Sequence, residues 1–422
     1  MAHHFQYKDG ILYAEDINLE KLANDVGTPL FVYSQATLER HFHVFAGAFS
    51  SKDILVAYSV KANSNISVLT ALAAQGAGAD IVSGGELQRA LAANIPPERI
   101  VFSGVGKSRD ELTLALETGI YQFNVESEAE LDALQEVASE RDKIAPVALR
   151  INPDVSAGGH EKISTGKSED KFGVPWKRAH ALYAKSRSFS HINACGVDVH
   201  IGSQIDDLAP FESAFRKVST LITDLRADGT VIDRLDLGGG LGIPYGDAQL
   251  PPHPIAYAEM IDRVTKPLGV RLIFEPGRMI AGNAGILIAR VTYVKPGDEK
   301  TFLILDTGMN DLIRPAFYDA FHEIKPICAP TTDDRVVYDV VGPVCETADR
   351  FAKARALPPL AEGALVAFMS AGAYGAVQSS QYNSRPLAPE VMVNGAQASV
   401  IRKRPTFAEM IRHEKIAPWL RR

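Results

Sequence analysis

The chain has 422 residues, a formal net charge of −7 and 46% hydrophobic residues. Its length exceeds what one ordinary hydrophobic core needs, so we expect more than one domain. The composition excludes a disordered chain, and the acidic balance argues against nucleic acid or an anionic membrane as the main partner.

The cysteines indicate a reducing compartment. Cys195, Cys328 and Cys345 are few, odd in number and widely spaced, which argues against a disulfide framework. They also lack the spacing of a zinc site, and we assign no metal ligands. The N-terminus lacks the apolar core of a signal peptide, and no apolar run is long enough to span a bilayer. We therefore expect a cytoplasmic protein.

The first half of the chain predicts an α/β barrel. A short strand near 11–13 and a short helix over 19–26 precede a longer helix over about 35–49. Short apolar strands then alternate with helices, and eight such strands are expected: 56–60, 79–82, 99–102, 121–125, 146–151, 196–200, 234–237 and 271–274. The helices between them include 86–93, 109–118, 128–141 and 211–228. Regular alternation means parallel strands joined by crossover helices, and eight units fit a TIM-type (β/α)8 barrel.

After Arg278 the pattern changes. Residues 281–285 are typical of a linker, and the strands beyond them are short and hairpin-like: 285–294, 301–306, 335–341 and 364–369. We predict a barrel over 31–280 and a mainly antiparallel β domain over 281–422, joined by the N-terminal segment 1–30. The connection between the fifth and sixth barrel strands is long and polar, which is usual for a functional or mobile loop.

Lys61 directly follows the first barrel strand, at the end where such barrels carry their active sites. Its side chain could simply reach solvent, as strand-end lysines often do. If the amine is desolvated, its pKa falls and the neutral form becomes a nucleophile that can form an imine.

Four further clusters follow predicted strands: 200–204 (HIGSQ), 238–242 (GGGLG), 275–278 (EPGR), and 342–346 (GPVCE) with 372–375 (GAYG) downstream. Each has an ordinary alternative. Consecutive glycines form an anion cradle or merely a tight turn, and His200 could be a hydrogen-bonded core residue. Glu275 and Arg278 could pair with each other, and Cys345 could be a small apolar residue.

Together these clusters supply what pyridoxal 5'-phosphate (PLP) requires: a lysine for a Schiff base, a ring that can stack, a phosphate cradle and a carboxylate for the ring nitrogen. The motif series, in this order, resembles the fold-type III PLP-dependent decarboxylases, and within them the diaminopimelate decarboxylases. The resemblance extends from about Pro29 to about Val393.

The resemblance implies a role for each motif. Lys61 would bind PLP covalently, His200 would stack on its ring, and Glu275 would pair with the pyridine nitrogen. The other cofactor-binding residues would be Ser203, Gly240, Gly277, Arg278 and Tyr374. The substrate would be held by Arg278, Arg314, Tyr318, Glu346 and Tyr374. Cys345 would act as the proton donor from the partner subunit, because the family forms homodimers with shared active sites.

Some positions depart from the family pattern, without removing a catalytic group. Ser59 stands where alanine is common, Thr347-Ala348 where Ser-Gly is usual, and Tyr382 where phenylalanine is common. Gly158-Gly159 lie in the long polar loop, where bulkier residues are common.

The resemblance implies decarboxylation of meso-2,6-diaminopimelate to L-lysine and carbon dioxide, the last step of lysine biosynthesis. A decarboxylase of ornithine, arginine or lysine with the same fold is the alternative. Its cationic substrates would favour an acidic pocket, often with aspartate after the cysteine, whereas Arg278 and Arg314 suit a carboxylate. Alanine racemase fits less well, and a non-catalytic regulator would not need Lys61, Glu275 and Cys345 together.

Overall fold

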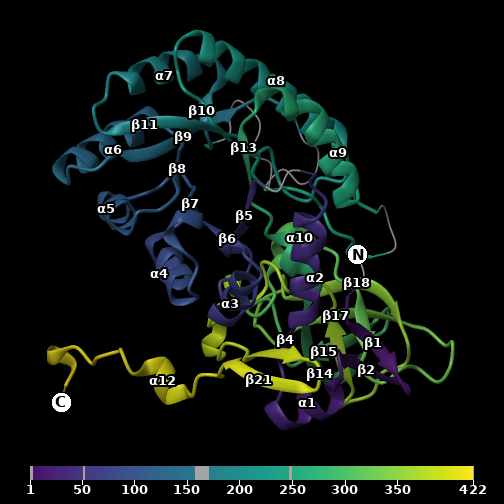
Figure 1. The fold of residues 1–422 in the computed structure, drawn as a ribbon. Helices are drawn as coiled ribbons and strands as arrows, with labels where there is room; N and C mark the ends of the chain where they lie inside the picture. Colours follow the sequence, from purple (N-terminus) through teal and green to yellow (C-terminus); the bar gives the residue numbers. More distant parts are fainter. Residues whose placement is uncertain (1–2, 51–52, 157–170, 247–249, 422) are drawn as a thin grey trace. The chain divides into compact units, whose positions relative to one another are not determined.

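The computed structural model describes residues 3–50, 53–156, 171–246 and 250–421. The chain divides into two compact units (Figure 1). The first, here called the barrel unit, comprises Met1–His3 and Gln35–Ala284, and the second, the β unit, comprises His4–Ser34 and Gly285–Arg422. No helix among the described residues is long and apolar enough to cross a membrane.

The barrel unit contains a closed ring of parallel strands. Eight strands make up the ring among the described residues, in this order around it: β5 (Ile54–Ser59), β6 (Gly78–Ile81), β7 (Ile100–Phe102), β8 (Gln122–Val125), β9 (Ala145–Asn152), β11 (Ile192–Asp198), β12 (Arg234–Asp236) and β13 (Arg271–Phe274). The ring closes where β13 pairs with β5, with Phe274 opposite Val56. The predicted (β/α)8 barrel and its strands are therefore confirmed. A two-residue strand, β10 (Val174–Pro175), pairs with β9 outside the ring.

Helices follow the strands and lie outside the ring (Figure 1): α3 (Ile66–Ala74), α4 (Gly84–Ala92), α5 (Arg109–Thr118), α6 (Glu128–Glu140), α7 (Ala179–Arg187), α8 (Leu208–Ala227), α9 (Pro254–Thr265) and α10 (Arg278–Ala281). Helix α2 (Gln35–Ala46) precedes β5. Local sequence starts several of them. Ser108 and Glu111, for example, form a reciprocal capping box at α5, which satisfies two otherwise unpaired backbone N–H groups.

The inward-facing positions change from apolar to polar along the strands. Leu55, Ala57, Val101 and Ile273 form a buried apolar cluster inside the barrel. Because side chains alternate along a strand, the next positions on the same face are Ser59, Ser103 and Glu275. The carboxyl end of the barrel is therefore lined with polar groups, although these groups are buried.

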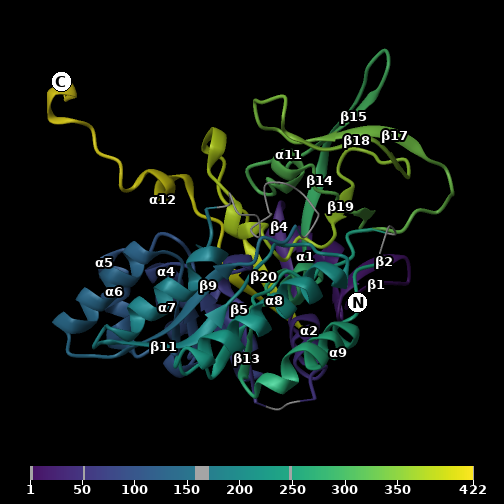
Figure 2. The ribbon, with the colours of Figure 1, turned by 90° about the horizontal axis from the view of Figure 1, so that it is seen from above.

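The β unit has two sheets. A small sheet comprises β1 (Phe5–Lys8), β2 (Ile11–Ala14) and β3 (Ile17–Asn18), followed by α1 (Leu19–Val26). The larger sheet comprises β4 (Leu30–Ser34), β14 (Gly285–Pro296), β15 (Thr301–Leu305), β16 (Ile324–Pro326), β17 (Val336–Val341), β18 (Arg350–Leu357), β19 (Leu365–Phe368), β20 (Glu390–Asn394) and β21 (Gln397–Arg402). Its pairings are mainly antiparallel, with parallel exceptions at β15–β17 and β4–β20. Figure 2 shows β14, β15, β17 and β18 grouped together.

Besides α1, the described part of the β unit has the helices α11 (Arg314–Tyr318) and α12 (Phe407–Ile411). Strand β4 pairs with β14 and β20, so this part of the N-terminal segment belongs to the larger sheet. Leu30 and Val32 of β4, with Ile286 and Val391, lie in one buried apolar cluster.

The two units meet in the chain between Ala284 and Gly285, inside the predicted linker at 281–285, but these residues form regular structure. Residue 281 ends helix α10, residues 282–284 form a 3₁₀ turn, and residue 285 begins β14, and all five are buried. A glycine at 282 permits close packing, because a Cβ there would lie 2.3 Å from Ile243 Cδ1. The glycines at 158 and 159, and most of the predicted polar loop, lie outside the described residues.

Candidate active site

Lys61 lies at the carboxyl end of β5, where a 3₁₀ turn over Val60–Ala62 interrupts the strand. Its Nζ lies 2.7 Å from Asp80 Oδ2, and the Lys61 side chain is 36% exposed whereas that of Asp80 is fully buried. Asp80 Oδ2 also accepts a 2.6 Å hydrogen bond from Ser59 Oγ. A buried carboxylate therefore orients an amine that remains accessible.

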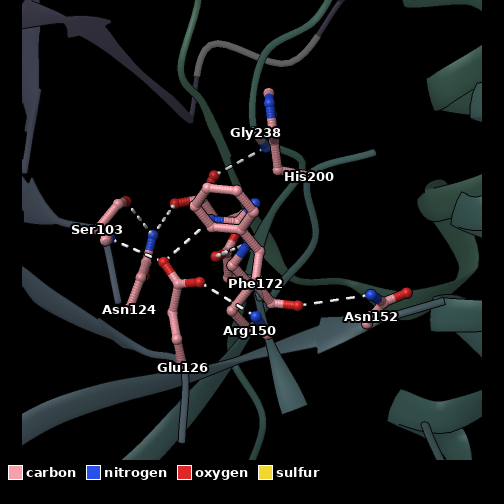
Figure 3. A network of polar contacts seen from close by, with 12 residues as sticks. Ser103, Asn124, Glu126, Arg150, Asn152, Phe172, His200 and Gly238 are labelled. Carbon is pink, nitrogen blue, oxygen red and sulfur yellow. Dashed lines mark hydrogen bonds and ion pairs between the residues drawn. The ribbon is translucent and has the colours of Figure 1, made fainter. Parts of the chain in front are cut away.

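A second polar layer surrounds Glu275, directly after β13. Glu275 Oε1 accepts hydrogen bonds from Ser103 Oγ at 3.0 Å and Asn124 Nδ2 at 3.1 Å. The Asn124 amide also donates to Asp236 Oδ2 at 3.1 Å, and Figure 3 shows Asn124 beside Ser103 in this network. Asn124 thus bridges two carboxyl groups from neighbouring parts of the barrel.

The carboxyl groups of Asp198, Asp236 and Glu275 offer oxygens that lie within 4.8 Å of one another. Burial raises the pKa of each well above its usual range, and repulsion among them raises the pKa further. Lys61 and Arg150 oppose this rise at Glu275. A metal ion could bridge such a spacing, but the raised pKa values favour carboxyls that retain or share protons, although the hydrogen bond from Asn124 lowers the pKa of Asp236.

Arg150 on β9 is a buried cation of the barrel interior. Its Nη1 donates to Glu126 Oε1 at 3.0 Å, and its guanidinium lies 5.0 Å from the centre of the Phe172 ring. His200 follows β11, and its Nδ1 accepts a 3.2 Å hydrogen bond from the Gly239 amide. Burial, with Arg150 and Lys61 nearby, lowers the pKa of His200 well below its usual range. The ring is therefore neutral, with its proton on Nε2.

The glycine run after β12 forms a tight turn. The Gly238 amide donates to Asp236 Oδ1 at 3.0 Å, so the amides of Gly238 and Gly239 both serve internal hydrogen bonds. A Cβ at Gly239 would lie 2.4 Å from Glu275 O, and one at Gly240 (φ +115°) would lie 2.6 Å from Gly202 O. The tight-turn alternative therefore holds for Gly238 and Gly239, and the phosphate role predicted for Gly240 stays a prediction.

Ser203 and Arg278 contact each other. Arg278 opens α10 and is 7% exposed. Its Nε and Nη2 lie 3.3 and 3.2 Å from Ser203 Oγ, and its Nη1 donates to Tyr245 OH. Gly277 allows this segment to pack against β5, because a Cβ there would lie 2.9 Å from both Ser59 Cβ and Ala62 Cβ. The predicted site residues of the barrel unit thus all lie at the carboxyl ends of its strands.

The remaining predicted residues belong to the β unit. Arg314 begins α11 and is 6% exposed, and Tyr318 ends the same helix. Cys345 and Glu346 are exposed in the protomer, in a loop that Asp349 supports by accepting from the Val344 amide at 2.7 Å. Tyr374 adopts φ +56°, a left-handed conformation that is strained for tyrosine.

Several polar residues of the site were not singled out from the sequence: Asp80, Ser103, Asn124, Glu126, Arg150, Asp198, Asp236 and Tyr245. A signal was present for half of them. Asp80, Asn124, Asp198 and Asp236 stand at or near the carboxyl ends of apolar strands, at positions where a fully buried strand would carry an apolar residue.

The barrel residues fit PLP. Lys61 offers an amine on a partly exposed side chain. The turn at Gly238–Gly240 packs its backbone against the loops that carry Glu275 and Gly202 more closely than any side chain would permit. Asp80 Oδ1 and Asp198 Oδ1 are buried and have no hydrogen-bond partner among the described residues. A protonated pyridine nitrogen beside Glu275 would bring a cation to this acidic cluster and relieve its repulsion.

Comparison with known proteins gives the same assignment. The family profile described as "Pyridoxal-dependent decarboxylase, pyridoxal binding domain" matches residues 35–282, more than half of the chain. The diaminopimelate decarboxylase of Haemophilus influenzae is 49% identical over 407 residues, which cover 96% of this chain and 98% of that protein.

Solved structures extend the similarity to the fold. The diaminopimelate decarboxylase of Helicobacter pylori, in complex with L-lysine, is 40% identical with a TM-score of 0.91, over 94% of this chain and 99% of that one. The M. jannaschii enzyme, also in complex with L-lysine, is 34% identical with a TM-score of 0.94, over 99% and 98% of the two chains. The chain therefore belongs to the PLP-dependent decarboxylases and, within them, to the diaminopimelate decarboxylase family.

Proposed function

We propose that the protein decarboxylates meso-2,6-diaminopimelate to L-lysine and carbon dioxide, the last step of lysine biosynthesis, with PLP as cofactor. The observation that carries this proposal is the 49% identity, over 96% of the chain, to a protein of this activity. The barrel chemistry agrees with it, because a strand-end lysine, a buried carboxyl and a tight glycine turn lie at one end of the barrel.

We assign the cofactor to the barrel unit, predicted over 31–280 and bounded in the structure by Gln35 and Ala284. Lys61 would hold PLP covalently, His200 would stack on its ring, and its phosphate would lie by Ser203 and Gly240. Gly277, Arg278 and Tyr374 would be further cofactor contacts. Bound PLP supplies an acceptor for the electron pair that remains on Cα when the carboxylate leaves. Glu275 would keep a proton on the pyridine nitrogen, because an adjacent carboxylate favours the cationic ring.

The protein's own groups would then handle protons and orientation. Asp80 holds the Lys61 amine at 2.7 Å and would direct it toward the cofactor. The C–C bond to the departing carboxylate breaks, carbon dioxide leaves, and the Cys345 thiol would donate the proton that replaces it at Cα. Cys345 and Glu346 are exposed in the protomer, which supports a homodimer in which they act in the partner's site. A reducing cytoplasm would suit this thiol.

The far end of the substrate would be held by Arg278, Arg314, Tyr318, Glu346 and Tyr374. A substitution of Arg314 tests substrate choice most directly. A buried guanidinium binds a carboxylate strongly and repels a cationic end group.

Arg314→Leu should raise KM for meso-diaminopimelate and lower kcat/KM by on the order of 10²-fold, because a charge-assisted pair is lost. Cofactor absorbance should not change, since the residue is assigned to the substrate alone. Arg290→Leu is a matched control, because that β-unit arginine bonds to Gly363 O and Asn24 Oδ1. Near-normal kinetics for Arg314→Leu would contradict the assignment and favour a cationic substrate.

A further inference from the structure

Arg314 is held by a buried histidine that was not predicted from the sequence. His322 is 2% exposed and lies between α11 and β16. Its Nε2 lies 2.8 Å from Arg314 Nη1, and its Nδ1 lies 2.8 Å from the carbonyl oxygen of Met369. The imidazole therefore connects the guanidinium to the main chain just beyond β19.

These two contacts define the state of the ring. A carbonyl oxygen can only accept, so Nδ1 must carry a proton. A guanidinium nitrogen can only donate, so Nε2 must present its lone pair. The ring is therefore neutral and in the Nδ1–H tautomer, because a second proton would place an N–H against the guanidinium N–H.

His322 is itself fixed from several sides. Its carbonyl oxygen accepts a 3.1 Å hydrogen bond from Arg355 Nη1, and the Arg355 guanidinium lies 4.2 Å from the centre of the Phe321 ring. The Met369 amide donates to Glu323 O at 2.9 Å, and β16 pairs with β19 directly beyond. The histidine thus sits on a hydrogen-bonded framework and cannot easily rotate away.

A neutral acceptor has a particular consequence for the arginine. A carboxylate in the same place would also fix the guanidinium, but it would neutralise the charge that attracts an anionic ligand. We propose that His322 is a positioning residue that aims Arg314 at the distal carboxylate of the substrate without adding a negative charge beside the guanidinium. The proposal rests on the proposed function and deepens it, because it makes the Arg314–His322 pair a determinant of selection for that carboxylate.

The test compares His322→Gln with His322→Glu in the PLP-loaded enzyme. The two replacements have nearly the same shape, and both can accept from Arg314, but only glutamate is charged. Glutamine should keep KM for meso-diaminopimelate within about threefold of the wild type. Glutamate should raise it by about tenfold or more, the scale of one lost charge-assisted hydrogen bond, with a much smaller change in kcat.

Inhibition gives a second readout. L-lysine keeps the distal carboxylate of the substrate, whereas cadaverine lacks it. His322→Glu should therefore weaken inhibition by L-lysine about as much as it raises KM, and it should leave inhibition by cadaverine unchanged or stronger. Cofactor absorbance and melting temperature, measured on the same samples, show whether each variant folds and binds PLP.

The Arg314→Leu variant distinguishes a failure of the proposed substrate contact from a failure of the role proposed for His322. If that variant behaves like the wild type, the proposed substrate contact itself fails. If it is impaired while His322→Gln and His322→Glu have equal KM values, or if L-lysine and cadaverine lose affinity equally in His322→Glu, the role of His322 is overturned and the proposed function stands.

Discussion

At the scale of single residues, the position of the Lys61 amine depends on the register between two strands. Ser59 of β5 lies opposite Asp80 of β6. This places the Asp80 carboxylate under the turn that carries Lys61, where its Oδ2 contacts both Ser59 Oγ and Lys61 Nζ. A shift of one residue would turn Asp80 to the other face of the strand. Ser59, where alanine is common in the family, therefore adds a hydrogen bond that alanine could not make.

Glu86 on α4 provides a pH test at the same place. Burial, with Asp80 adding repulsion, raises the pKa of Glu86 from 4.5 to about 7, although its carboxylate accepts from the Val82 amide at 2.8 Å. A carboxyl whose pKa is raised in the folded state binds more protons there than in the unfolded state. Its contribution to stability therefore falls as pH rises through this interval.

We expect the melting temperature of the wild type, relative to Glu86→Gln, to fall as pH rises from about 4.5 to about 7 and then to level off. Thermal unfolding of both proteins, each saturated with PLP, at half-unit pH steps would measure the difference. A difference that does not vary with pH would show that Glu86 has no raised pKa.

The sequence predicted residues whose type is unusual for their position, and it missed residues whose role depends on neighbours. Lys61 could be found because a lysine after an apolar strand is poor packing material. Ser103 gave no such signal, and the strand-end position of Asn124 did not reveal its partners, since only ring closure brings β7, β8 and β13 together around Glu275. His322 was missed because its partners, Arg314 and the Met369 carbonyl, meet only in the folded β unit.

At the scale of elements, the glycine turn after β12 shows how loops at the barrel's polar end support one another. The turn lies against the loop after β11, where the Ile205 amide donates to Gly240 O at 2.9 Å and the Gly242 amide donates to Ile205 O at 3.1 Å. Glycines are needed because the backbone of neighbouring loops occupies the space of a side chain. The turn therefore fixes the loop that carries both His200 and Ser203.

Gly240→Ala should weaken PLP binding by about tenfold or more and lower the melting temperature, because its Cβ would meet Gly202 O at 2.6 Å. Gly229→Ala is a matched control: Gly229 also has positive φ, +87°, but no atom lies within 4 Å of a Cβ there. The control should lose only about 1–2 kcal/mol of folding stability, the cost of a left-handed backbone at a residue with a Cβ, and it should bind PLP normally. Titration with PLP would compare the two variants. Equal affinities would contradict a role for the glycine turn in cofactor binding.

Most barrel elements could be predicted because strand and helix periodicities alternate strongly there. The strands of the β unit were harder to predict from the sequence. Strands β18 and β21 carry exposed basic or polar residues, so their sequences lack the apolar pattern of a strand. The error at 281–285 had a different cause, since Gly282 serves close packing against Ile243 and not chain flexibility.

At the scale of the whole molecule, the predicted site residues are divided between two units. The barrel unit holds Lys61, His200 and Glu275, and the β unit holds Arg314, Cys345 and Tyr374. The sequence alone could assign these residues to one reaction only through family resemblance, because no local pattern links them. The proposed homodimer would supply Cys345 and Glu346 from the partner subunit.

Mixing Lys61→Ala with Cys345→Ala subunits tests this arrangement. Each variant alone should be inactive or nearly so, and Lys61→Ala should also lack a borohydride-reducible bond to PLP. After subunit exchange, half of the dimers would be mixed and one of their two sites intact, so about a quarter of the wild-type activity should return. Absence of recovery, with exchange demonstrated by differently tagged subunits, would rule out shared sites.

The most direct test of the central claim is an assay of the purified, PLP-loaded protein against a panel of amino acids, with products identified by mass. The panel should contain meso-diaminopimelate, L-lysine, L-ornithine and L-arginine. We predict one carbon dioxide and one L-lysine for each meso-diaminopimelate consumed, with little or no turnover of the other three. Turnover of lysine, ornithine or arginine in preference to meso-diaminopimelate would contradict the proposed function.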